Sequence, residues 1–300
     1  VPITVLPLPE QNAPPTLSAN SLQVAQAGEP ATLDLREAAS DPDPQDADAL
    51  EFAVTGGSVE GVDVSIDGSV LTARAQNNAA KGTEGTISVS VTDGNHDPVS
   101  STVTISVVAT DRPPAVAVDD VVPDAHQGET VTVPVLDNDS NPFPETPLKI
   151  LSAQPQDGGQ GSVTVSGDVL EITPNEDFVG TMGVIYRIQD ATEDPDRETE
   201  GSVTLTVKGK PDAPSTPRMV SEGNQTAVLT WDVPADNGER ITSYTVSGGG
   251  FSQECAANTC TLQNLTNNQE YNFTVTATNA VGTSEASPAS GVVRPDVKPE

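Results

Sequence analysis

Carboxylate side chains grouped in short loops are the residues of this sequence best suited to chemistry. One loop carries four of them within a few positions: Asp41, Asp43, Asp46 and Asp48. Calcium ions in proteins take about six to eight oxygen ligands, so this loop supplies a partial ligand set. Asp93 and Asp97 are expected at the same end of the same domain and would add to it. The loop is not an EF-hand, because Asp46 stands where that loop needs its glycine.

A second acidic set follows the same pattern later in the chain. Asp137 and Asp139 are expected to meet Asp190 and Asp194 at one end of the next domain. Structural calcium is therefore one hypothesis for both sets, and no other cofactor is required. The alternative is that these carboxylates are simply solvated and keep the protein soluble.

The two cysteines, Cys255 and Cys260, are separated by four residues. Facing residues of adjacent antiparallel strands have Cα atoms within about 5.5 Å, which suits a disulfide. We therefore expect a disulfide across a hairpin, with two free thiols as the alternative. A zinc site is not expected, because the two histidines, His96 and His126, lie far away in the sequence.

Catalytic motifs are missing from the sequence. There is no G-x-S-x-G nucleophile turn, no H-E-x-x-H zinc motif and no glycine loop suited to phosphate. Neither histidine has a serine or cysteine nucleophile motif beside it. Pairs of carboxylates abound and could serve a glycosidase, but small β-sandwiches rarely have the large cleft that such an enzyme needs. The sequence predicts a protein that is not an enzyme.

Composition limits the partners. The chain has 300 residues, with 44 acidic and 13 basic side chains and a net charge of −31. Nucleic acid and anionic membrane surfaces repel such a chain, so neither is an expected partner. No apolar run approaches the length of a membrane span, so we expect no membrane insertion. A cationic protein or a divalent cation is the expected counterpart, and the chain is expected to be monomeric.

An internal repeat indicates how the acidic loops are positioned. Strand-like runs followed by proline-rich connectors recur about every hundred residues, at 3–15, 103–114 and 203–217. This spacing matches β-sandwich domains, and proline makes the connectors semi-rigid. We predict an all-β, elongated array of Greek-key sandwiches with these parts: 1–10 as the last strand of a preceding domain with its linker, 11–112, 113–210 and 211–295 as domains, and 296–300 as a linker. We expect the chain to be a fragment of a longer protein.

The last domain carries the clearest pattern. Residues 271–278 alternate apolar and polar side chains, and Tyr271 opens this strand six residues after Leu265, as in a tyrosine corner. With Trp231 and Tyr244 upstream, residues 211–295 resemble a fibronectin type III module. Phe251 follows three glycines and is either an exposed aromatic anchor or a core residue.

The second domain has motifs of its own. They are Ala117-Val118-Asp119-Asp120, Val135-Leu136-Asp137-Asn138-Asp139, Ile172-Thr173-Pro174 with Phe178-Val179-Gly180, and Tyr186 with Asp190. These motifs resemble bacterial immunoglobulin-like, cadherin-like tandem repeats of surface proteins, in which calcium stiffens the junctions. The sequence departs from them where Asn141-Pro142-Phe143 replaces an acidic loop. The first domain shares the pattern more loosely, at 40–52 and 91–95.

These resemblances imply an extracellular fragment of a bacterial surface protein, attached to the cell by segments outside it. The first hypothesis is adhesion, in which the last domain binds a host matrix, receptor or cytokine-type protein. Its exposed loops are the expected contact surface. The candidate residues are Asp236, Asn237, Glu239, Arg240, Phe251, Asn279, Thr283 and Glu285. The alternatives are a passive spacer and an accessory module of a secreted carbohydrate-active enzyme.

Overall fold

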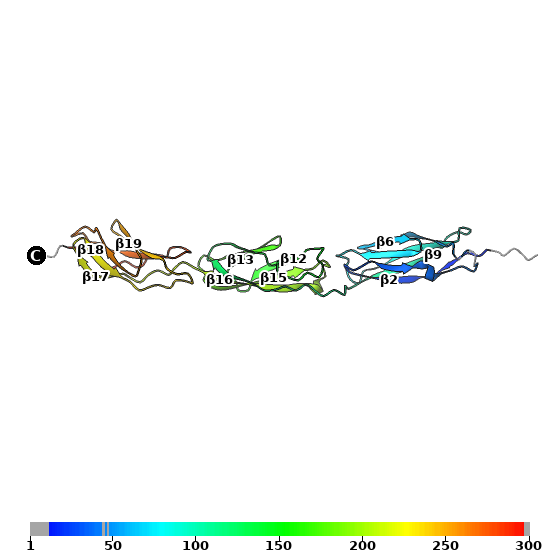
Figure 1. The fold of residues 1–300 in the computed structure, drawn as a ribbon, viewed down its shortest axis with the longest axis horizontal. Coiled ribbons are helices and arrows are strands. Elements are labelled where there is room, and N and C mark those ends of the chain that lie inside the picture. Colours follow the sequence, from blue (N-terminus) through cyan, green and yellow to red (C-terminus); the bar gives the residue numbers. More distant parts are fainter. Residues whose placement is uncertain (1–11, 44–45, 47, 297–300) are drawn as a thin grey trace, which may run out of the picture. The chain divides into compact units, whose positions relative to one another are not determined.

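The computed structural model describes residues 12–43, 46 and 48–296 (Figure 1). The strand predicted within residues 1–10 lies outside the described residues, as does most of the predicted linker 296–300. The described chain consists of β-strands joined by loops and two short 3-10 helices. Among the described residues, no helix is long and apolar enough to cross a membrane.

Module one (residues 12–108) forms two main sheets, ordered β2-β9-β8-β5 and β3-β7-β6, with a small β1-β4 pair. Its elements are β1 (Thr16–Leu17), β2 (Asn20–Ala25), β3 (Ala31–Asp34), the 3-10 helix η1 (Leu35–Ala38), β4 (Ala39–Ser40), β5 (Glu51–Gly57), β6 (Val62–Asp67), β7 (Val70–Ala75), β8 (Glu84–Thr92) and β9 (Val99–Val108). Alternating apolar residues bury one face of each sheet, and Leu71, Ile87 and Ile105 are almost completely buried in the core.

Module two (residues 116–208) repeats this plan, with sheets ordered β10-β16-β15-β12 and β11-β14-β13. Its elements are β10 (Asp120–His126), β11 (Val131–Val133), β12 (Lys149–Pro155), β13 (Gly161–Ser166), β14 (Val169–Pro174), β15 (Gly180–Gln189), the 3-10 helix η2 (Pro195–Arg197) and β16 (Thr199–Lys208). In both modules the first long strand runs parallel to the last one, as β2 with β9 and β10 with β16. The sequence pattern gives the strands but not this parallel pairing.

Module three (residues 212–293) has sheets ordered β17-β18-β21 and β20-β19-β22. Its strands are β17 (Arg218–Gly223), β18 (Thr226–Thr230), β19 (Ser243–Gly248), β20 (Phe251–Cys255), β21 (Thr259–Leu262) and β22 (Thr274–Thr278). Trp231 is 1% exposed and packs edge-on against Tyr244, with ring centroids 5.3 Å apart. The Tyr271 hydroxyl accepts a hydrogen bond from the Thr266 N–H at 2.9 Å, which is a tyrosine corner.

The segment after β22 pairs with this strand in an irregular way. Three serines spaced three residues apart, Ser284, Ser287 and Ser290, lie along β22 and the residues before it. The partner residues are Ala277 for Ser284, Val275 for Ser287 and Phe273 for Ser290. Each serine N–H donates to the carbonyl oxygen of its partner residue, and each serine hydroxyl accepts from the N–H of that residue. Polyproline II has three residues per turn, so serines spaced by three lie on one side of the segment. That side faces β22 and makes the hydrogen bonds.

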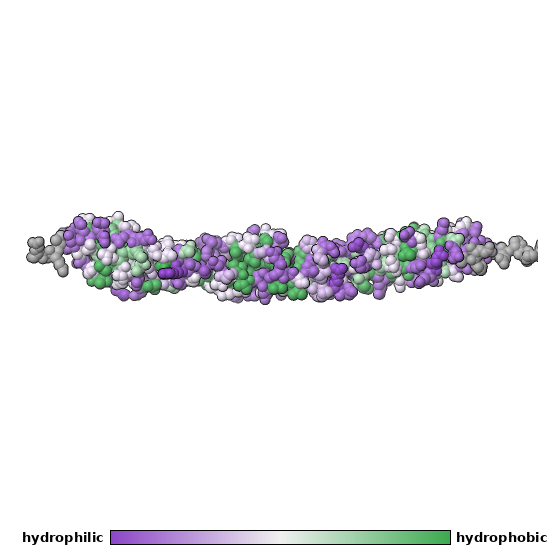
Figure 2. All heavy atoms as spheres, viewed as in Figure 1, coloured by the Kyte–Doolittle hydropathy of each residue, from purple (hydrophilic) through white to green (hydrophobic). Residues whose placement is uncertain are grey.

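Hydrophilic residues cover much of the face shown in Figure 2, with hydrophobic residues gathered in small patches between them. Several valines are exposed, among them Val121 at 70% and Val233 at 62%. Single exposed valines are normal on a soluble protein and need no partner.

Candidate functional site

The first linker, defined as residues 109–115, is bound by one arginine from module two. Arg197 ends the helix η2, and its guanidinium donates to the carbonyl oxygens of Arg112 at 2.9 Å and Pro113 at 2.8 Å. The same guanidinium pairs with the Asp190 carboxylate at 2.7 Å. The Arg197 side chain is 11% exposed and that of Asp190 is 0% exposed. This charge pair is therefore desolvated, and its hydrogen bonds fix the linker backbone.

Phe143 lies beneath this linker and is 4% exposed. The guanidinium carbons of Arg112 and Arg197 lie 5.0 and 5.8 Å from its ring centroid, which is cation–π distance. Arg112 also donates to the Pro142 carbonyl oxygen at 2.9 Å. The departure Asn141-Pro142-Phe143 from the acidic-loop pattern thus supplies an aromatic base for two arginines.

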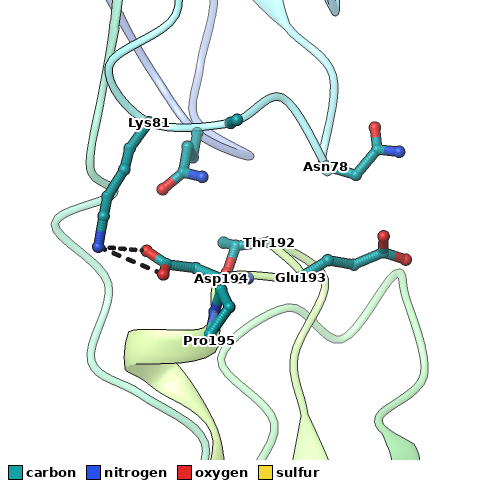
Figure 3. A pocket seen from close by; sticks show the side chains of 8 residues that line it. Asn78, Lys81, Thr192, Glu193, Asp194 and Pro195 are labelled. Atoms are coloured by element: carbon teal, nitrogen blue, oxygen red, sulfur yellow. Dashed lines mark hydrogen bonds and ion pairs between the residues drawn. The ribbon is translucent and has the colours of Figure 1, made fainter.

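Lys81 of module one forms ion pairs with two aspartates of module two, and Figure 3 shows the pair with Asp194. Its Nζ lies 2.9 Å from Asp194 and 2.5 Å from Asp196. Burial raises the pKa of the Asp194 carboxyl, but the Lys81 hydrogen bond, the Asp196 N–H and the charges of Lys81 and Arg197 together outweigh burial and lower that pKa overall. The hydrogen bonds from Asp196 and then Asp194 raise the pKa of Lys81. The Lys81 side chain is 41% exposed, so water and salt screen these pairs.

A hollow of about 260 Å³ lies beside these pairs. Its lining residues are Gln26, Asn78, Ala80, Lys81, Thr192, Glu193, Asp194 and Pro195. Gln26 is 1% exposed and donates to the Ala79 carbonyl oxygen at 2.9 Å. The hollow continues the polar contacts around the first linker.

The second linker, defined as residues 209–217, is bound by Asn279 from module three. This side chain is 5% exposed, and its Nδ2 lies 2.8 Å from the Gly209 carbonyl oxygen. Nδ2 also donates to the carbonyl oxygens of Asp236 and Glu239, at 3.1 and 3.2 Å. Its Oδ1 accepts two backbone N–H groups from its own loop. Asn279 thus joins the linker and two loops with its full hydrogen-bonding capacity.

Asn237 adds contacts to the same linker. The Gly209 N–H donates to the Asn237 carbonyl oxygen at 2.9 Å. The Asn237 side chain donates to the Lys210 carbonyl oxygen at 2.7 Å and to the Asp212 carboxylate at 3.0 Å. The Asp212 N–H donates to the Ala235 carbonyl oxygen at 3.0 Å. The linker backbone therefore pairs with module three before the first strand, β17, begins.

Lys208, the last residue of β16, connects acidic groups of two modules. Its Nζ lies 2.9 Å from Asp124 on β10 and 3.0 Å from Glu239 of module three. The hydrogen bond with Lys208 lowers the pKa of Asp124. Hydrogen bonds to Asp124 and Glu239 raise the pKa of Lys208. One lysine thus pairs with a carboxylate on each side of the second linker.

The loops expected to contact a partner are therefore largely occupied within the chain. Asn237, Glu239 and Asn279 bind the second linker or Lys208, and the Asp236 carbonyl oxygen accepts from Asn279. The sequence indicates exposed loops for these residues, because it does not show that the linker enters at the same end of the sandwich. Thr283 bonds Thr278 through its hydroxyl at 3.0 Å, and Glu285 is exposed.

Phe251 and Arg240 have different surroundings. Phe251 is partly buried against the core and packs edge-on against Phe273, with centroids 5.8 Å apart, as expected of the core residue and not of the exposed anchor. Arg240 is exposed and has no ion pair among the described residues. It borders a hollow of about 300 Å³, together with Val233, Pro234, Asp236, Ile241, Tyr244 and Ala256 to Asn258.

The two cysteines form a disulfide, with Cα atoms 5.8 Å apart. The expectation of a hairpin is wrong, because Cys255 is on β20 and Cys260 on β21, in different sheets. The bridge therefore ties the two sheets together. Within its loop, Asn258 donates to the Trp231 carbonyl oxygen at 2.8 Å and accepts from the Trp231 N–H at 3.1 Å.

The residues expected to bind calcium differ in their surroundings: some have partners within the protein and others are exposed. In module one, Asp43 accepts from the Ala13 N–H at 2.7 Å and Asp46 from the Asn12 side chain at 2.8 Å. Asp93 pairs with His96 at 2.8 Å. Asp41 has a buried Oδ2 without a partner among the described residues. Asp48 and Asp97 are exposed.

In module two, protein cations take the place expected for calcium. Arg197 forms an ion pair with Asp190, and Lys81 forms one with Asp194. Asp137 is exposed, and Asp139 accepts from the Val118 N–H. Among the described residues there is no group of three or more metal-ligating side chains placed to hold an ion, so calcium stays a prediction. Sequence reasoning missed Arg197 and Lys81; the single arginine within the acidic run 193–200 was the available signal.

The chain was compared with curated proteins and with solved structures. A search among curated proteins found no match. Among solved structures, titin domains A168–A170 are 18% identical, with TM-score 0.38, covering 94% of this chain and 99% of that one. Titin module A71 from human cardiac muscle is 31% identical, with TM-score 0.25, covering 29% of this chain and 97% of that one. A structure of titin kinase with its flanking domains is 26% identical, with TM-score 0.26; the match covers 29% of this chain and 17% of that one.

Two family models match the chain. The fibronectin type III domain model matches residues 212–293. The bacterial Ig domain model matches residues 12–106 and 111–208, which together make up more than half of the chain. Such domains are generally non-catalytic and are typical of extracellular proteins. The chain belongs to the bacterial Ig domain family, with two tandem copies followed by a fibronectin type III domain.

Proposed function

We propose that this chain is a non-catalytic spacer of a bacterial surface protein, whose linkers are held by side chains of the modules they join. The observation that carries this proposal is the bond from Asn279 to Gly209. Asn279 was expected to contact a partner protein, and its side chain binds the linker backbone instead. Fixing one residue of backbone costs about 1–2 kcal/mol of conformational entropy, so several bonds are needed to order a linker. Arg197 supplies such bonds to the first linker.

Small-angle scattering tests the spacer role on the full chain. The double variant Arg197→Met, Asn279→Ala should sample a broader range of dimensions than the unaltered chain, because both linkers lose their bonds. The variant Lys149→Met, Thr283→Ala is the matched control, since neither side chain has a contact with a linker among the described residues. Identical scattering from the double variant and the unaltered chain would contradict the proposal.

Recognition of an extracellular protein is the second candidate function. The specific observation is Arg240, an exposed cation without an ion pair among the described residues, beside a hollow with the exposed Val233. Saturable binding of the immobilised chain to one member of a panel of matrix, receptor and cytokine proteins supports this function if Arg240→Glu removes it. Binding to no member of that panel favours the spacer alone.

Structural calcium is proposed for module one only. Asp41 Oδ2 and Asn12 Oδ1 are buried without a partner among the described residues, whereas Asp190 has Arg197. Millimolar calcium added to the full chain should shift the NMR signals of Asp41 and Asp93 and leave those of Asp190 unchanged. Chelator should reverse the shifts. Unchanged signals throughout module one would remove calcium from the account.

A further inference from the structure

The turn that binds the second linker contains the one Asn-Gly sequence of the chain, Asn237-Gly238. The two residues have φ values of 54° and 88°, and the Glu239 N–H donates to the Asp236 carbonyl oxygen at 3.2 Å. Positive φ at both central residues defines a type I′ turn, which favours asparagine followed by glycine. A Cβ added at Gly238 would also lie only 3.3 Å from Lys208 Cγ. The fold therefore favours glycine directly after this asparagine.

An Asn-Gly pair has a chemical reactivity of its own. Glycine has no side chain to shield its backbone nitrogen, so this nitrogen reaches the side-chain carbonyl carbon of the preceding asparagine more easily than that of any other residue. The Gly238 N–H donates to the Asp236 carboxylate at 3.2 Å, and both residues are exposed to water. The carboxylate meets the proton in the plane of the peptide, whereas the nitrogen attacks from its face. The attacking nitrogen therefore has a proton acceptor beside it.

The reaction consumes one water molecule and releases one molecule of ammonia. The Gly238 nitrogen loses its proton and bonds to Asn237 Cγ. The bond from Cγ to Nδ2 breaks, and Nδ2 takes up that proton and leaves as ammonia. A succinimide ring remains, and water opens it at either carbonyl, which gives aspartate or isoaspartate in place of Asn237. These steps transfer no electrons to or from another molecule, so water is the one co-reactant.

The amide that leaves is the group that binds the second linker. Asn237 Nδ2 donates to the Lys210 carbonyl oxygen at 2.7 Å and to the Asp212 carboxylate at 3.0 Å. A carboxylate in its place has no proton to donate and repels Asp212. Lys208 already pairs with two other carboxylates. Isoaspartate also lengthens the backbone beside the Asn237 carbonyl oxygen, which accepts from the Gly209 N–H at 2.9 Å.

We propose that Asn237 is a site of spontaneous deamidation, and that its conversion releases the second linker from module three. The release rests on the proposed spacer function, whereas the reaction at Asn237 does not. The hydrogen bonds from Nδ2 hold the side-chain amide in place, so they slow the reaction while the linker is bound. Conversion therefore takes place when the linker opens, and it makes the opening permanent.

Incubation of the full chain at mildly alkaline pH, followed by proteolysis and mass spectrometry, tests the reaction. Asn237 should be the first asparagine to convert. Asn264 and Asn268 are controls within the same chain, because both have positive φ and are exposed but neither is followed by glycine. Asn279→Ala should speed the conversion of Asn237, since it weakens the hold on the linker. Conversion of all three asparagines at one rate, or of none of them, would overturn the proposal, as would an unchanged rate in Asn279→Ala.

Hydrogen exchange at the Gly209 amide tests the release. Asn237→Asp reproduces one product of the reaction and should speed this exchange by about tenfold or more, because a charge-assisted hydrogen bond is lost. Asn264→Asp is the matched control, since it adds the same charge at positive φ and has no contact with the linker among the described residues. Equally slow exchange in both variants and the unaltered chain would overturn the release and leave the spacer function standing. Fast exchange in the unaltered chain would overturn the spacer function and the release together.

Discussion

Asn279 donates a hydrogen bond from Nδ2 to the carbonyl oxygen of Gly209 over 2.8 Å, and the two residues are 70 positions apart in sequence. A loop at the end of module three where the linker enters thereby closes over the chain that leaves module two. The Asn279 side chain is buried, and its amide oxygen accepts two further N–H groups. This one side chain therefore couples the second linker to the folding of module three.

Asn279→Ala should destabilise module three by about 2 kcal/mol or more, because five backbone groups lose the hydrogen bond that the Asn279 side chain makes to them. Trp231 is the single tryptophan and lies in the core of module three, so its fluorescence during urea unfolding reports on this module. Thr283→Ala in the same loop is the control and should cost less than about 0.5 kcal/mol, as at an ordinary surface position. Equal midpoints for the two variants would argue against the role of Asn279.

Arg197→Met should destabilise module two by about 3–5 kcal/mol, because Asp190 would remain buried without its cation. Hydrogen exchange of β15 and β16 in the full chain measures this loss. Lys149→Met removes an exposed ion pair with Glu193 and should cost less than about 1 kcal/mol. Asp190→Leu combined with Arg197→Met should recover part of the lost stability, since no charge stays buried. If Arg197→Met alone cost less stability than Lys149→Met, the account would be contradicted.

Replacing Cys255 and Cys260 by serine should lower the stability of module three by about 2 kcal/mol in the chain-entropy model for so short a loop. Urea unfolding followed by Trp231 fluorescence gives the value, and alkylation without reductant checks the bridge in the unaltered chain. Asn258 should also lose order, because its loop is held at both ends by the bridge. Stability equal to that of the unaltered chain would show that the sheets need no covalent tie.

The pair of Asp93 and His96 should make the loops of module one sensitive to pH. The hydrogen bond with Asp93 raises the pKa of His96, and the hydrogen bond with His96 lowers the pKa of Asp93 to about 2. The histidine contribution is present below its unfolded pKa of about 6.5 and is lost as the pH rises through the folded value. The aspartate contribution is present above about 3.9 and is lost as the pH falls toward about 2.

An NMR titration of the His96 ring measures the first of these limits. Asp93→Asn should lower the His96 pKa, because the ring loses its charged acceptor at 2.8 Å. Asp97→Asn, at an exposed neighbouring position, should change it much less. An equal change in both variants would mean that His96 responds to general acidity and not to this pair.

The sequence predicts the sandwich type well where packing is local. Leu265, Tyr271 and the alternation over 271–278 lie within one short stretch of sequence, and the structure places them with Trp231 in one core. The serine segment after β22 was missed, because its period of three does not match the period of two used to find strands. The parallel pairing of first and last strands was also missed, since no local pattern encodes it.

The contacts of the linkers could not be predicted, because they depend on which loops share an end of each sandwich. Asn237 and Asn279 are polar loop residues, which suits an exposed rim as well as an internal hydrogen bond. Asp190 and Asp194 suit calcium until Arg197 and Lys81 are placed beside them. Long-range partners decide these roles, and the type of each residue alone does not.

The backbone amide of Gly209 tests most directly whether the second linker is held. Its N–H donates to the Asn237 carbonyl oxygen at 2.9 Å, so hydrogen exchange at this amide reports on the linker itself. In the full chain we predict exchange at least about tenfold slower than in an unstructured peptide, and a return toward the peptide rate in Asn279→Ala. Exchange at the peptide rate in the unaltered chain would contradict the account, because the linker would then be free of module three.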